Sequence, residues 1–365
     1  MSKYFATKVI GKQTLIDESM VLELINQDAF SETFVPRSKI LPYLRKHYSA
    51  FTTAITPHEA LTRNQLFTGD AIDLIKRLPD KSIQCVVTST PYWAMRIYDT
   101  TFEREWADGE ICPFGLEQTP EGFIRHSVEV LYHLFPKMSS KGSIWWNIMD
   151  SYNTRTQIRN NAAEALHAMQ GHDKRTWKDY KYKRYSAGHS FLKDGEQCLI
   201  PQRISERVSR MGYYCKSSIS WCKSSTLPEP QNSRVSRSIE YILHFSIERT
   251  PIFHKERYLT LSPALGGKQS LESEKLSDFW YLPTSSGGED HGAQFPIQLP
   301  ARCIAISTEP GDIVLDPFIG AGNTAIAAAL LERDYIGFDI SEKYIETARK
   351  RIESATYQMT LPNMF

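Results

Sequence analysis

The stretch DIVLDPFIGAGNTAIAAALLERDYIGFDISEKYIETARKRI, residues 312–352, decides the fold of this chain. Its two short apolar runs, IVL and YIGF, alternate with two segments of helical periodicity, which predicts a strand, turn, helix, strand, helix unit. Strands separated by helices of about 10 to 15 residues pair in parallel, so the unit predicts an α/β fold. The same alternation occurs from residue 64 onward, and we expect those segments to join one sheet.

The turn after the first strand carries Gly320 and Gly322 and leads into a helix. Glycine lets backbone approach a ligand, and a helix N-terminus offers free N–H groups, so the turn suits a nucleotide or a carboxylate. Ala325 replaces the third glycine of the G-x-G-x-x-G fingerprint, which disfavours a dinucleotide dehydrogenase. Asp339 ends the second strand, where it can bind ribose hydroxyls or cap the next helix, although Ser341 could cap instead. Together the two features favour a cofactor that contains a ribose.

The upstream segments extend the pattern. Strands or helices are expected at residues 65–70, 71–80, 83–89, 119–138, 142–150, 200–212, 213–223, 238–246 and 295–308. Thr119 and Pro120 are typical of an N-cap and a first helical position. Residues 1–62 look helical in places, as in TLIDESMVLELI at 14–25, and prolines interrupt them.

Two segments break the alternation. Residues 154–190 carry eight basic and three acidic side chains, interleaved with one tryptophan and three tyrosines. This pattern suits phosphate and base contacts, and a solvated insertion is the alternative. Residues 249–290 lack a clear period and contain Gly and Ser clusters, which predicts a loop-rich insertion.

Composition limits the classes of function. With 43 basic and 42 acidic residues the formal charge is +1, so a polyanion-binding surface has to come from local clustering. No apolar run could span a membrane and the N-terminus lacks an apolar signal segment, so we expect a cytoplasmic protein without membrane contact. The six cysteines form no C-x-x-C pair, which fits reduced thiols and argues against a zinc site, and we expect no metal.

A second stretch, VVTSTPYWAM at residues 86–95, ends an apolar strand in a hydroxyl, a proline and two aromatic rings. Pro91 fixes its own φ and biases Thr90 toward an extended conformation, which directs the carbonyl groups of Ser89 and Thr90. Tyr92 can offer a flat face to a planar ring, while the Ser89 hydroxyl both donates and accepts. The stretch therefore predicts a clamp for a planar, hydrogen-bonding heterocycle.

With these motifs the chain resembles the amino-methylating DNA methyltransferases, which use S-adenosyl-L-methionine. TSTPYW resembles their T-S-P-P-Y-W motif, DPFIGAGNT their D-P-F-x-G-S-G-T motif, and HGAQFPIQLPARCI the H-x-A-x-F-P-x-x-L motif that precedes it. Three further segments resemble parts of the same family: FWYLPTSSG at 279–287, NQLFTGDAIDLIKRLPDKSI at 64–83 and RSIEYILHFS at 237–246. The first motif precedes the second, which is the permuted order of the β class. The resemblance spans roughly residues 64–150 and 197–356.

This resemblance implies a Rossmann-like methyltransferase fold, circularly permuted, with a mixed, mostly parallel sheet and inserted recognition segments. The expected parts are an N-terminal extension without an assigned role (1–62), the catalytic half of the core (63–150), a basic insertion for DNA recognition (151–195), continued core (196–248), a loop-rich insertion for target recognition (249–290), the cofactor-binding half (291–356) and a tail (357–365).

The family's activity implies site-specific methylation of the exocyclic amine of a flipped-out base in double-stranded DNA. The catalytic residues would be Ser89, Thr90, Pro91 and Tyr92. The Ser89 hydroxyl and the Thr90 carbonyl would accept the amine N–H bonds, and Tyr92 would stack on the base. Serine in the first motif position favours cytosine N4 over adenine N6. Carbon-5 methylation needs a thiolate, usually in a Pro-Cys pair, and no cysteine here follows a proline.

The resemblance also assigns the remaining site residues. Asp70 would hold the adenine end of the cofactor, Asp339 the ribose and Phe295 the methionine part, and the same site would include Thr88, Asp316, Phe318, Gly320, Gly322, Asn323 and Thr324. Candidate DNA contacts are Trp93, Arg96, Tyr98, Arg155, Lys174, Arg175, Lys181, Lys183 and Arg184. A restriction endonuclease that shares the DNA site is an expected partner, and the chain would act as a monomer or homodimer.

Two positions depart from the family pattern. Thr90 replaces the first proline of S-P-P-Y, which removes one fixed φ and restores a backbone N–H. Asn323 stands where the family often has Thr or Ser. Two alternatives therefore stay open: a methyltransferase-like fold that binds DNA without efficient catalysis, and a methyltransferase that acts on amines of protein or RNA.

Overall fold

The structure is a computed structural model that describes residues 61–93, 101–153, 192–193, 195–224, 232–284 and 294–360, and the backbone of the strand pair at 7–10 and 13–16. The strands are β1 (Thr7–Ile10), β2 (Gln13–Ile16), β3 (Gln65–Thr68), β4 (Ile83–Ser89), β5 (Arg104–Glu105), β6 (Ile111–Cys112), β7 (Met138–Ile148), β8 (Tyr214–Lys223), β9 (Ile239–Ser246), β10 (Phe279–Leu282), β11 (Ile313–Asp316) and β12 (Asp334–Asp339). The helices are α4 (Ala71–Arg77), α5 (Pro120–Leu134), η2 (Phe135–Lys137), α7 (Ile200–Arg210), α8 (Arg257–Thr260), η4 (Pro263–Leu265), α9 (Gln298–Ser307), α10 (Asn323–Leu330) and α11 (Glu342–Thr360).

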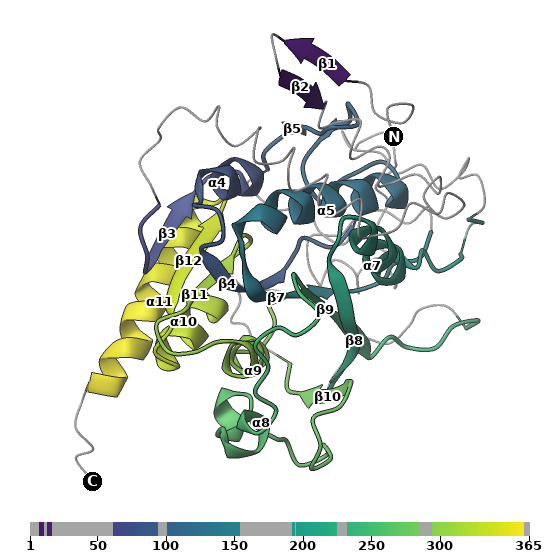
Figure 1. Ribbon diagram of the computed structural model, residues 1–365. Helices are drawn as coiled ribbons and strands as arrows, with labels where there is room; N and C mark the ends of the chain where they lie inside the picture. The colour runs from purple at the N-terminus through teal and green to yellow at the C-terminus, as the bar shows by residue number, and fades with distance from the viewer. Residues whose placement is uncertain are drawn as a thin grey trace.

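Eight of these strands form the central sheet, in the order β10-β8-β9-β7-β4-β11-β12-β3 (Figure 1). Five consecutive strands of this sheet run parallel to one another, in the order β7-β4-β11-β12-β3. β9 lies antiparallel to both β7 and β8, and β10 runs parallel to β8. The prediction of a mixed, mostly parallel sheet is confirmed.

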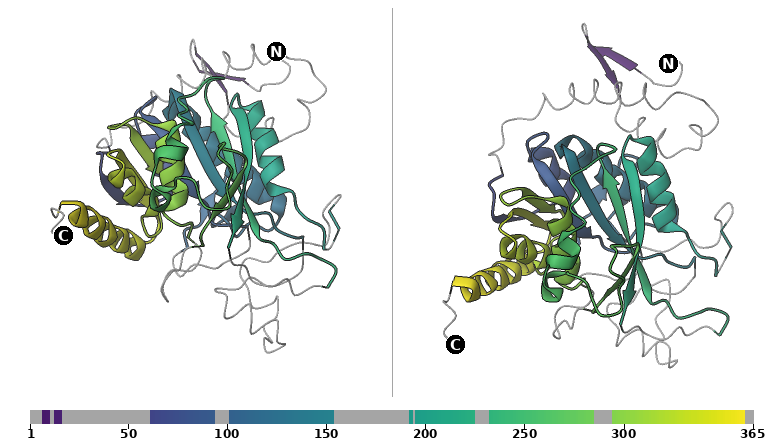
Figure 2. Two further views of the ribbon diagram at one scale, coloured as in Figure 1. Left: turned by 90° about the horizontal axis from the view of Figure 1, so that it is seen from below. Right: turned by 60° about the horizontal axis from the view of Figure 1, so that its bottom comes forward.

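Helices cover both faces of the sheet, with α4, α5 and α7 on one face and α9, α10 and α11 on the other (Figures 1 and 2). Successive side chains in a strand point to opposite faces. Accordingly, Trp146 packs in the core with Phe123 of α5, while the adjacent Trp145 packs with Leu299 of α9. None of the helices in the described part of the chain is both long and apolar enough to cross a membrane.

The expected start of α5 is confirmed, because the Thr119 hydroxyl accepts a hydrogen bond from the Gly122 N–H at 3.0 Å and Pro120 occupies the first turn. The helical interpretation of residues 14–25 is wrong at its start, where residues 14–16 belong to β2. Ile10 pairs with Gln13, which leaves only Gly11 and Lys12 between β1 and β2. A two-residue connection that begins with glycine is a hairpin signal, and it outweighs the helical period here.

The segment 249–290 was expected to be a loop-rich insertion, and the structure describes it as far as residue 284. It contributes the edge strand β10 to the central sheet, and Trp280 of that strand is 1% exposed. A four-residue strand gives too short an alternation to be recognised in sequence.

β4, β11, β12 and β3 run parallel and therefore end at the same edge of the sheet. Ligands of open α/β sheets bind in the crevice outside the carboxyl ends of the strands. Ser89, Asp316 and Asp339 are the last residues of three of these strands, and Asp70 follows the fourth by two residues.

Candidate active site at the carboxyl edge of the sheet

A buried carboxylate joins the two motif turns. Asp316, the last residue of β11, accepts hydrogen bonds from the Thr88 and Thr324 hydroxyls, each at 2.6 Å, and from the Phe318 N–H at 3.0 Å. Burial raises the pKa of Asp316 to about 6, and the two hydroxyls and the N–H only partly offset this. These hydrogen bonds fix the turn after β11 relative to the end of β4. They are shielded from water, because all three side chains are at most 2% exposed: Thr88, Asp316 and Thr324.

The two glycines of this turn have different physical roles. Gly320 has φ +50°, and a Cβ added there would meet no atom within 4 Å. Gly322 has φ +90°, and its added Cβ would lie 2.9 Å from the Cβ of Ala348 in α11. Gly322 therefore permits close packing of α11, whereas Gly320 borders open space at the start of α10. That open space suits a ligand that approaches the backbone.

Asp339 lies beside the Gly320 turn. Its Oδ2 accepts the Gly320 N–H at 3.1 Å and its Oδ1 the Ser341 N–H at 2.8 Å. Burial raises the pKa of Asp339 to about 6, although these two backbone N–H groups oppose the shift. Ser341, not Asp339, caps α11, because the Ser341 hydroxyl accepts the Tyr344 N–H at 3.4 Å.

Asp70 lies on the neighbouring strand, where Thr68 of β3 pairs with Asp339 of β12. The Asp70 Oδ1 accepts the Asp73 N–H at 3.1 Å as the N-cap of α4, and it accepts a hydrogen bond from Arg104 Nη1 at 2.5 Å. Burial raises the pKa of Asp70 despite the nearby guanidinium. The acidic residues predicted at the ribose and adenine positions thus lie on adjacent strands.

Phe295 and Asn323 are linked directly. The Asn323 side-chain amide donates to the Phe295 carbonyl at 2.8 Å, and its oxygen accepts a hydrogen bond from Arg351 of α11 at 2.8 Å. Asn323 therefore holds the segment before α9 against α11. The resemblance to the family motif, in which this position is often Thr or Ser, did not predict this role. Phe318 packs on Phe114, with ring centroids 5.4 Å apart.

The Tyr92 hydroxyl lies at the centre of a polar network at the ends of β4, β7 and β9. It lies 2.5 Å from Glu240 Oε2 and 3.0 Å from Asn147 Oδ1, and it accepts a hydrogen bond from the Ser89 hydroxyl at 3.3 Å. Lys223 pairs with the other oxygen of Glu240 at 2.7 Å. This network fixes the orientation of the Tyr92 ring beside Ser89.

Sequence reasoning missed Glu240 and Asn147. Glu240 is the one acidic residue in the apolar strand β9, and Asn147 is a polar residue within the apolar run of β7. Asn147 is also the register partner of Ser89. A buried polar residue in an apolar strand requires a partner, and that signal could have singled out both residues.

The rest of the motif loop is packed against the protein. Thr90 is 4% exposed, and within the described residues its hydroxyl has no hydrogen-bond partner. A Cβ added to Gly115 would lie 3.0 Å from Pro91 Cβ, so the two segments are in close contact. Trp93 is 1% exposed and its indole N–H donates to the Glu117 carbonyl at 2.9 Å. The prediction of Trp93 as a DNA contact is therefore corrected, because its ring fills the core.

The other candidate DNA contacts lie outside the described residues. They are Arg96, Tyr98, Arg155, Lys174, Arg175, Lys181, Lys183 and Arg184.

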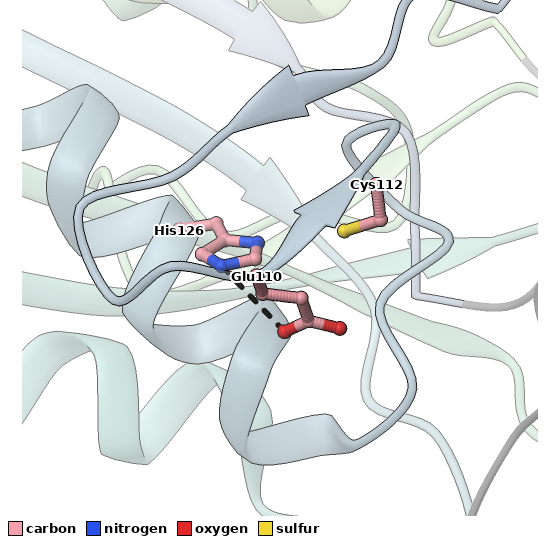
Figure 3. A group of neighbouring side chains, drawn as sticks. All are labelled: Glu110, Cys112 and His126. Atoms are coloured by element: carbon pink, nitrogen blue, oxygen red, sulfur yellow. Dashed lines mark ion pairs between the residues drawn. The ribbon is translucent and has the colours of Figure 1, made fainter.

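A second polar cluster braces the loop that contacts Pro91 and Trp93. Glu110, Cys112 and His126 each bring one potential metal-ligand atom within 4.8 Å of the others (Figure 3). Both imidazole nitrogens already face carboxylates, with Nδ1 at 3.1 Å from Glu117 and Nε2 at 3.3 Å from Asp108. Burial would lower the pKa of His126, but the two carboxylates outweigh it and raise the pKa to about 9. An imidazolium between two carboxylates explains the cluster, and it leaves no nitrogen lone pair for a metal.

This cluster makes stability sensitive to alkaline pH. The pKa of His126 rises from 6.5 when unfolded to about 9 when folded, so its proton stabilises the fold fully below pH 6.5. As pH rises through about 9 this contribution is lost, and we expect the free energy of unfolding to fall by about 3 kcal/mol. Urea unfolding across this range measures the change. In His126→Gln the alkaline loss should be absent, and an equal loss in the variant would contradict the assignment.

The comparisons with known proteins agree with this architecture. Residues 83–350 match the model of a family described as DNA methylase. The chain is 29% identical over 298 residues to the type II methyltransferase M.XycI of Xanthomonas campestris pv. cyanopsidis, which covers 80% of this chain and 89% of the relative. The fold is similar to that of the cytosine-N4-specific PvuII DNA methyltransferase, with a TM-score of 0.53, 17% identity and coverage of 84% and 89%. It is also similar to a Thermus thermophilus protein in complex with S-adenosyl-L-methionine, with a TM-score of 0.51, 21% identity and coverage of 80% and 94%.

Proposed function

Since this chain belongs to the DNA methylase family, we propose that it transfers a methyl group from S-adenosyl-L-methionine to the N4 amine of a flipped-out cytosine in double-stranded DNA. One observation carries the proposal. Ser89 and the Gly320 turn follow the adjacent strands β4 and β11, and the 2.6 Å bond from Thr88 to Asp316 ties the two strand ends together. A methyl donor on the turn would then lie next to a base held by Ser89.

The residues around the turn fit S-adenosyl-L-methionine. Gly320 borders open space, so the backbone can approach the ligand closely. Each Asp339 oxygen accepts one backbone N–H and retains a lone pair for a ribose hydroxyl. Asp70, which follows the next strand β3 and caps α4, is proposed to hold the adenine end. When bound, the cofactor supplies an activated methyl group on a sulfonium.

The motif loop supplies the other half of the chemistry. An exocyclic amine is a poor nucleophile because its lone pair is conjugated with the ring. Hydrogen bonds from the amine to the Ser89 hydroxyl and the Thr90 carbonyl would make the nitrogen pyramidal and free the lone pair for in-line attack. Ser89 donates to Tyr92, which lies 2.5 Å from Glu240, so this chain of hydroxyls offers a path for the proton that the amine loses.

The choice of cytosine N4 is supported by serine at the first position of the motif. Adenine N6 is the alternative, since a hydroxyl can accept a hydrogen bond from either amine. M.XycI is named a type II methyltransferase, which supports a role beside a restriction endonuclease that shares the DNA site. We place this reaction in the cytoplasm, with the basic insertion at 151–195 and the segment 249–290 as the DNA-recognition parts.

A second candidate function is favoured by Thr90. Its buried hydroxyl has no partner among the described residues, and such a group costs about 1–3 kcal/mol. Thr90 also replaces the first proline of the family motif, which removes one fixed φ from the loop, so the second candidate is a methyltransferase-like DNA-binding protein with weak catalysis.

Labelled S-adenosyl-L-methionine and mixed-sequence duplex DNA distinguish these functions. Mass spectrometry of the digested nucleosides should show N4-methylcytosine. Detection of N6-methyladenine instead would change the proposed target from cytosine to adenine. DNA binding without transfer of label to any DNA sequence would favour the second candidate. Label in protein or RNA but not in DNA would overturn the proposal.

Cofactor affinity is expected to depend on Asp339. Asp339→Asn should bind S-adenosyl-L-methionine about 10- to 100-fold more weakly, because a charged acceptor for the ribose is lost. In the wild type the affinity should fall as pH is lowered through about 6, the pKa of Asp339, where the carboxylate becomes protonated. Calorimetric titrations from about pH 5 to about pH 8 measure both effects.

The matched control is Asp334→Asn, at the opposite end of β12, where the carboxylate pairs with Arg63. It should bind the cofactor as the wild type does. Equal affinity in Asp339→Asn would remove Asp339 from the site, and any pH dependence left in that variant would report on Asp316.

A further inference from the structure

Two arginines share one aromatic ring at the edge of the sheet that holds the motif loop. The guanidinium carbon of Arg234 lies 3.9 Å from the centroid of the Tyr152 ring, and that of Arg237 lies 5.1 Å from it. Tyr152 follows the end of β7, and Arg237 precedes the start of β9. Because β7 and β9 are antiparallel neighbours, these two positions lie at the same edge. We call Arg234, Arg237 and Tyr152 the arginine platform.

The platform borders the motif loop on two sides. Ser151, the residue before Tyr152, donates a hydrogen bond to the Trp93 carbonyl at 3.4 Å. Glu240, three residues after Arg237, lies 2.5 Å from the Tyr92 hydroxyl. Whatever the platform binds would therefore lie next to a base held by Ser89 and Tyr92.

Within the described residues, neither arginine of the platform forms an ion pair. The ion pairs described for other arginines, such as Arg203 and Arg207 with Glu121, do not include Arg234 or Arg237. Arg237 donates to the Asp150 carbonyl oxygen at 2.7 Å, which orients its guanidinium without neutralising it.

The nearest carboxylate has other partners. The Asp150 side chain accepts N–H groups from Ser151 at 2.9 Å, Ile200 at 2.9 Å and Leu199 at 3.0 Å. It holds the start of α7 and forms no ion pair with either arginine, although the positive charge of the nearby Arg237 opposes the rise in the pKa of Asp150 that burial causes. Two half-buried cations that form no ion pair among the described residues are suited to an external anion, since a charge withdrawn from water requires a partner.

The chemistry of the platform favours phosphate. A guanidinium presents a planar fork of N–H donors that matches two phosphate oxygens. Stacking on an aromatic ring orients this fork by cation–π attraction and leaves its edge available. Val235, between the two arginines, is 81% exposed, so the segment is open to a large ligand.

We propose that Arg234 and Arg237, held on the Tyr152 ring, bind backbone phosphates of the DNA strand that carries the target base. This inference rests on the proposed function, because it takes DNA as the substrate. Phosphate contacts set the position of a duplex without reading its sequence. The platform would therefore hold the strand beside the flipped base, and recognition of the sequence would belong to other parts of the chain.

The test compares DNA binding by the full chain with Arg234→Gln, Arg237→Gln and the double variant. Fluorescence anisotropy of a labelled duplex that the wild type methylates gives the affinity from roughly 50 to 200 mM salt. Each substitution should weaken binding and reduce the slope of log affinity against log salt by about one. The affinity for S-adenosyl-L-methionine should stay unchanged and shows that the variants are folded.

Three controls separate phosphate binding from simple loss of charge or structure. Lys350→Gln removes one exposed charge from α11 and should leave the slope unchanged. Arg234→Lys and Arg237→Lys keep the charge and should keep the slope. Tyr152→Leu removes the ring and should weaken DNA binding several-fold, whereas Tyr152→Phe should not.

A double glutamine variant with wild-type affinity and slope would overturn the platform while the proposed function stands, because the wild type methylates the same duplex. A wild-type protein that neither binds nor methylates DNA would overturn both.

Discussion

Ser89→Ala is expected to lower the rate of methyl transfer at least about 100-fold and to leave the affinity for S-adenosyl-L-methionine unchanged. The Ser89 hydroxyl contacts Tyr92 at 3.3 Å, and its register partner on β7 is Asn147. Alanine would remove the group proposed to accept an amine N–H and to begin the path toward Glu240. Ser89 forms no hydrogen bond with Asp339 or Gly320, which are proposed to hold the cofactor, and the hydrogen bond from the adjacent Thr88 to Asp316 should survive the substitution.

Single-turnover transfer of labelled methyl groups to DNA measures the rate, and calorimetry measures cofactor binding. The matched control is Ser82→Ala, just before the other end of β4, where the hydroxyl bonds to the Pro79 carbonyl. It should transfer at the wild-type rate. Full turnover by Ser89→Ala would exclude the assigned role, and loss of cofactor binding would show a structural defect instead.

Glu240→Gln should also slow transfer with cofactor binding intact, if the hydroxyl chain carries the proton.

Arg302→Ala should destabilise the fold by about 3–5 kcal/mol, the usual cost of removing one partner from a buried ion pair. Arg302 is 0% exposed and pairs with both oxygens of Glu272, at 2.7 and 2.8 Å. It also donates to the carbonyls of Gly266 and Gly267, at 2.5 and 2.9 Å. Without the guanidinium, the buried Glu272 carboxylate loses its cationic partner and keeps only neutral donors, such as the Gln269 and Tyr281 N–H groups.

Urea unfolding measures this loss, with Arg63→Ala as the control. Arg63 also pairs with an aspartate, but its side chain is 60% exposed, and its removal should cost less than about 1 kcal/mol. Arg302→Lys keeps the charge but not the planar fork, and should fall between the two. If Arg302→Ala unfolds at the same urea concentration as Arg63→Ala, the pair does not anchor the segment 249–284 to α9.

The strands that carry the candidate site residues could be predicted from sequence, because strand and helix periodicity follow local rules. Apolar runs that alternate with helical periods predict parallel strands, and parallel strands end at one edge of their sheet. Ser89 and Asp339 were predicted at strand ends and Asp316 was named through the family resemblance, and the structure shows that all three end parallel strands of one sheet. Gly320 and Gly322 were singled out because glycine lets backbone approach a ligand before a helix N-terminus, and the structure gives both a positive φ.

The roles of individual side chains depended on contacts between distant segments. Tyr92 was predicted to offer a flat face to a planar ring, and the structure adds that its hydroxyl is held by Asn147 and Glu240, which lie 55 and 148 residues away in sequence. Asn323 was seen as a mild replacement, but it bridges Phe295 and Arg351. The sequence alone does not state which side chains will face each other across two strands or two helices.

The sequence by itself therefore determined the fold class and the order of the motifs, because backbone preferences and periodicity act over a few residues. The tertiary structure alone decided that Thr90 and Trp93 are buried, that Arg302 pairs with Glu272 inside the core, and that two arginines share the Tyr152 ring. Burial and charge pairing depend on which elements pack together. That packing joins residues far apart in the chain, so no local pattern records it.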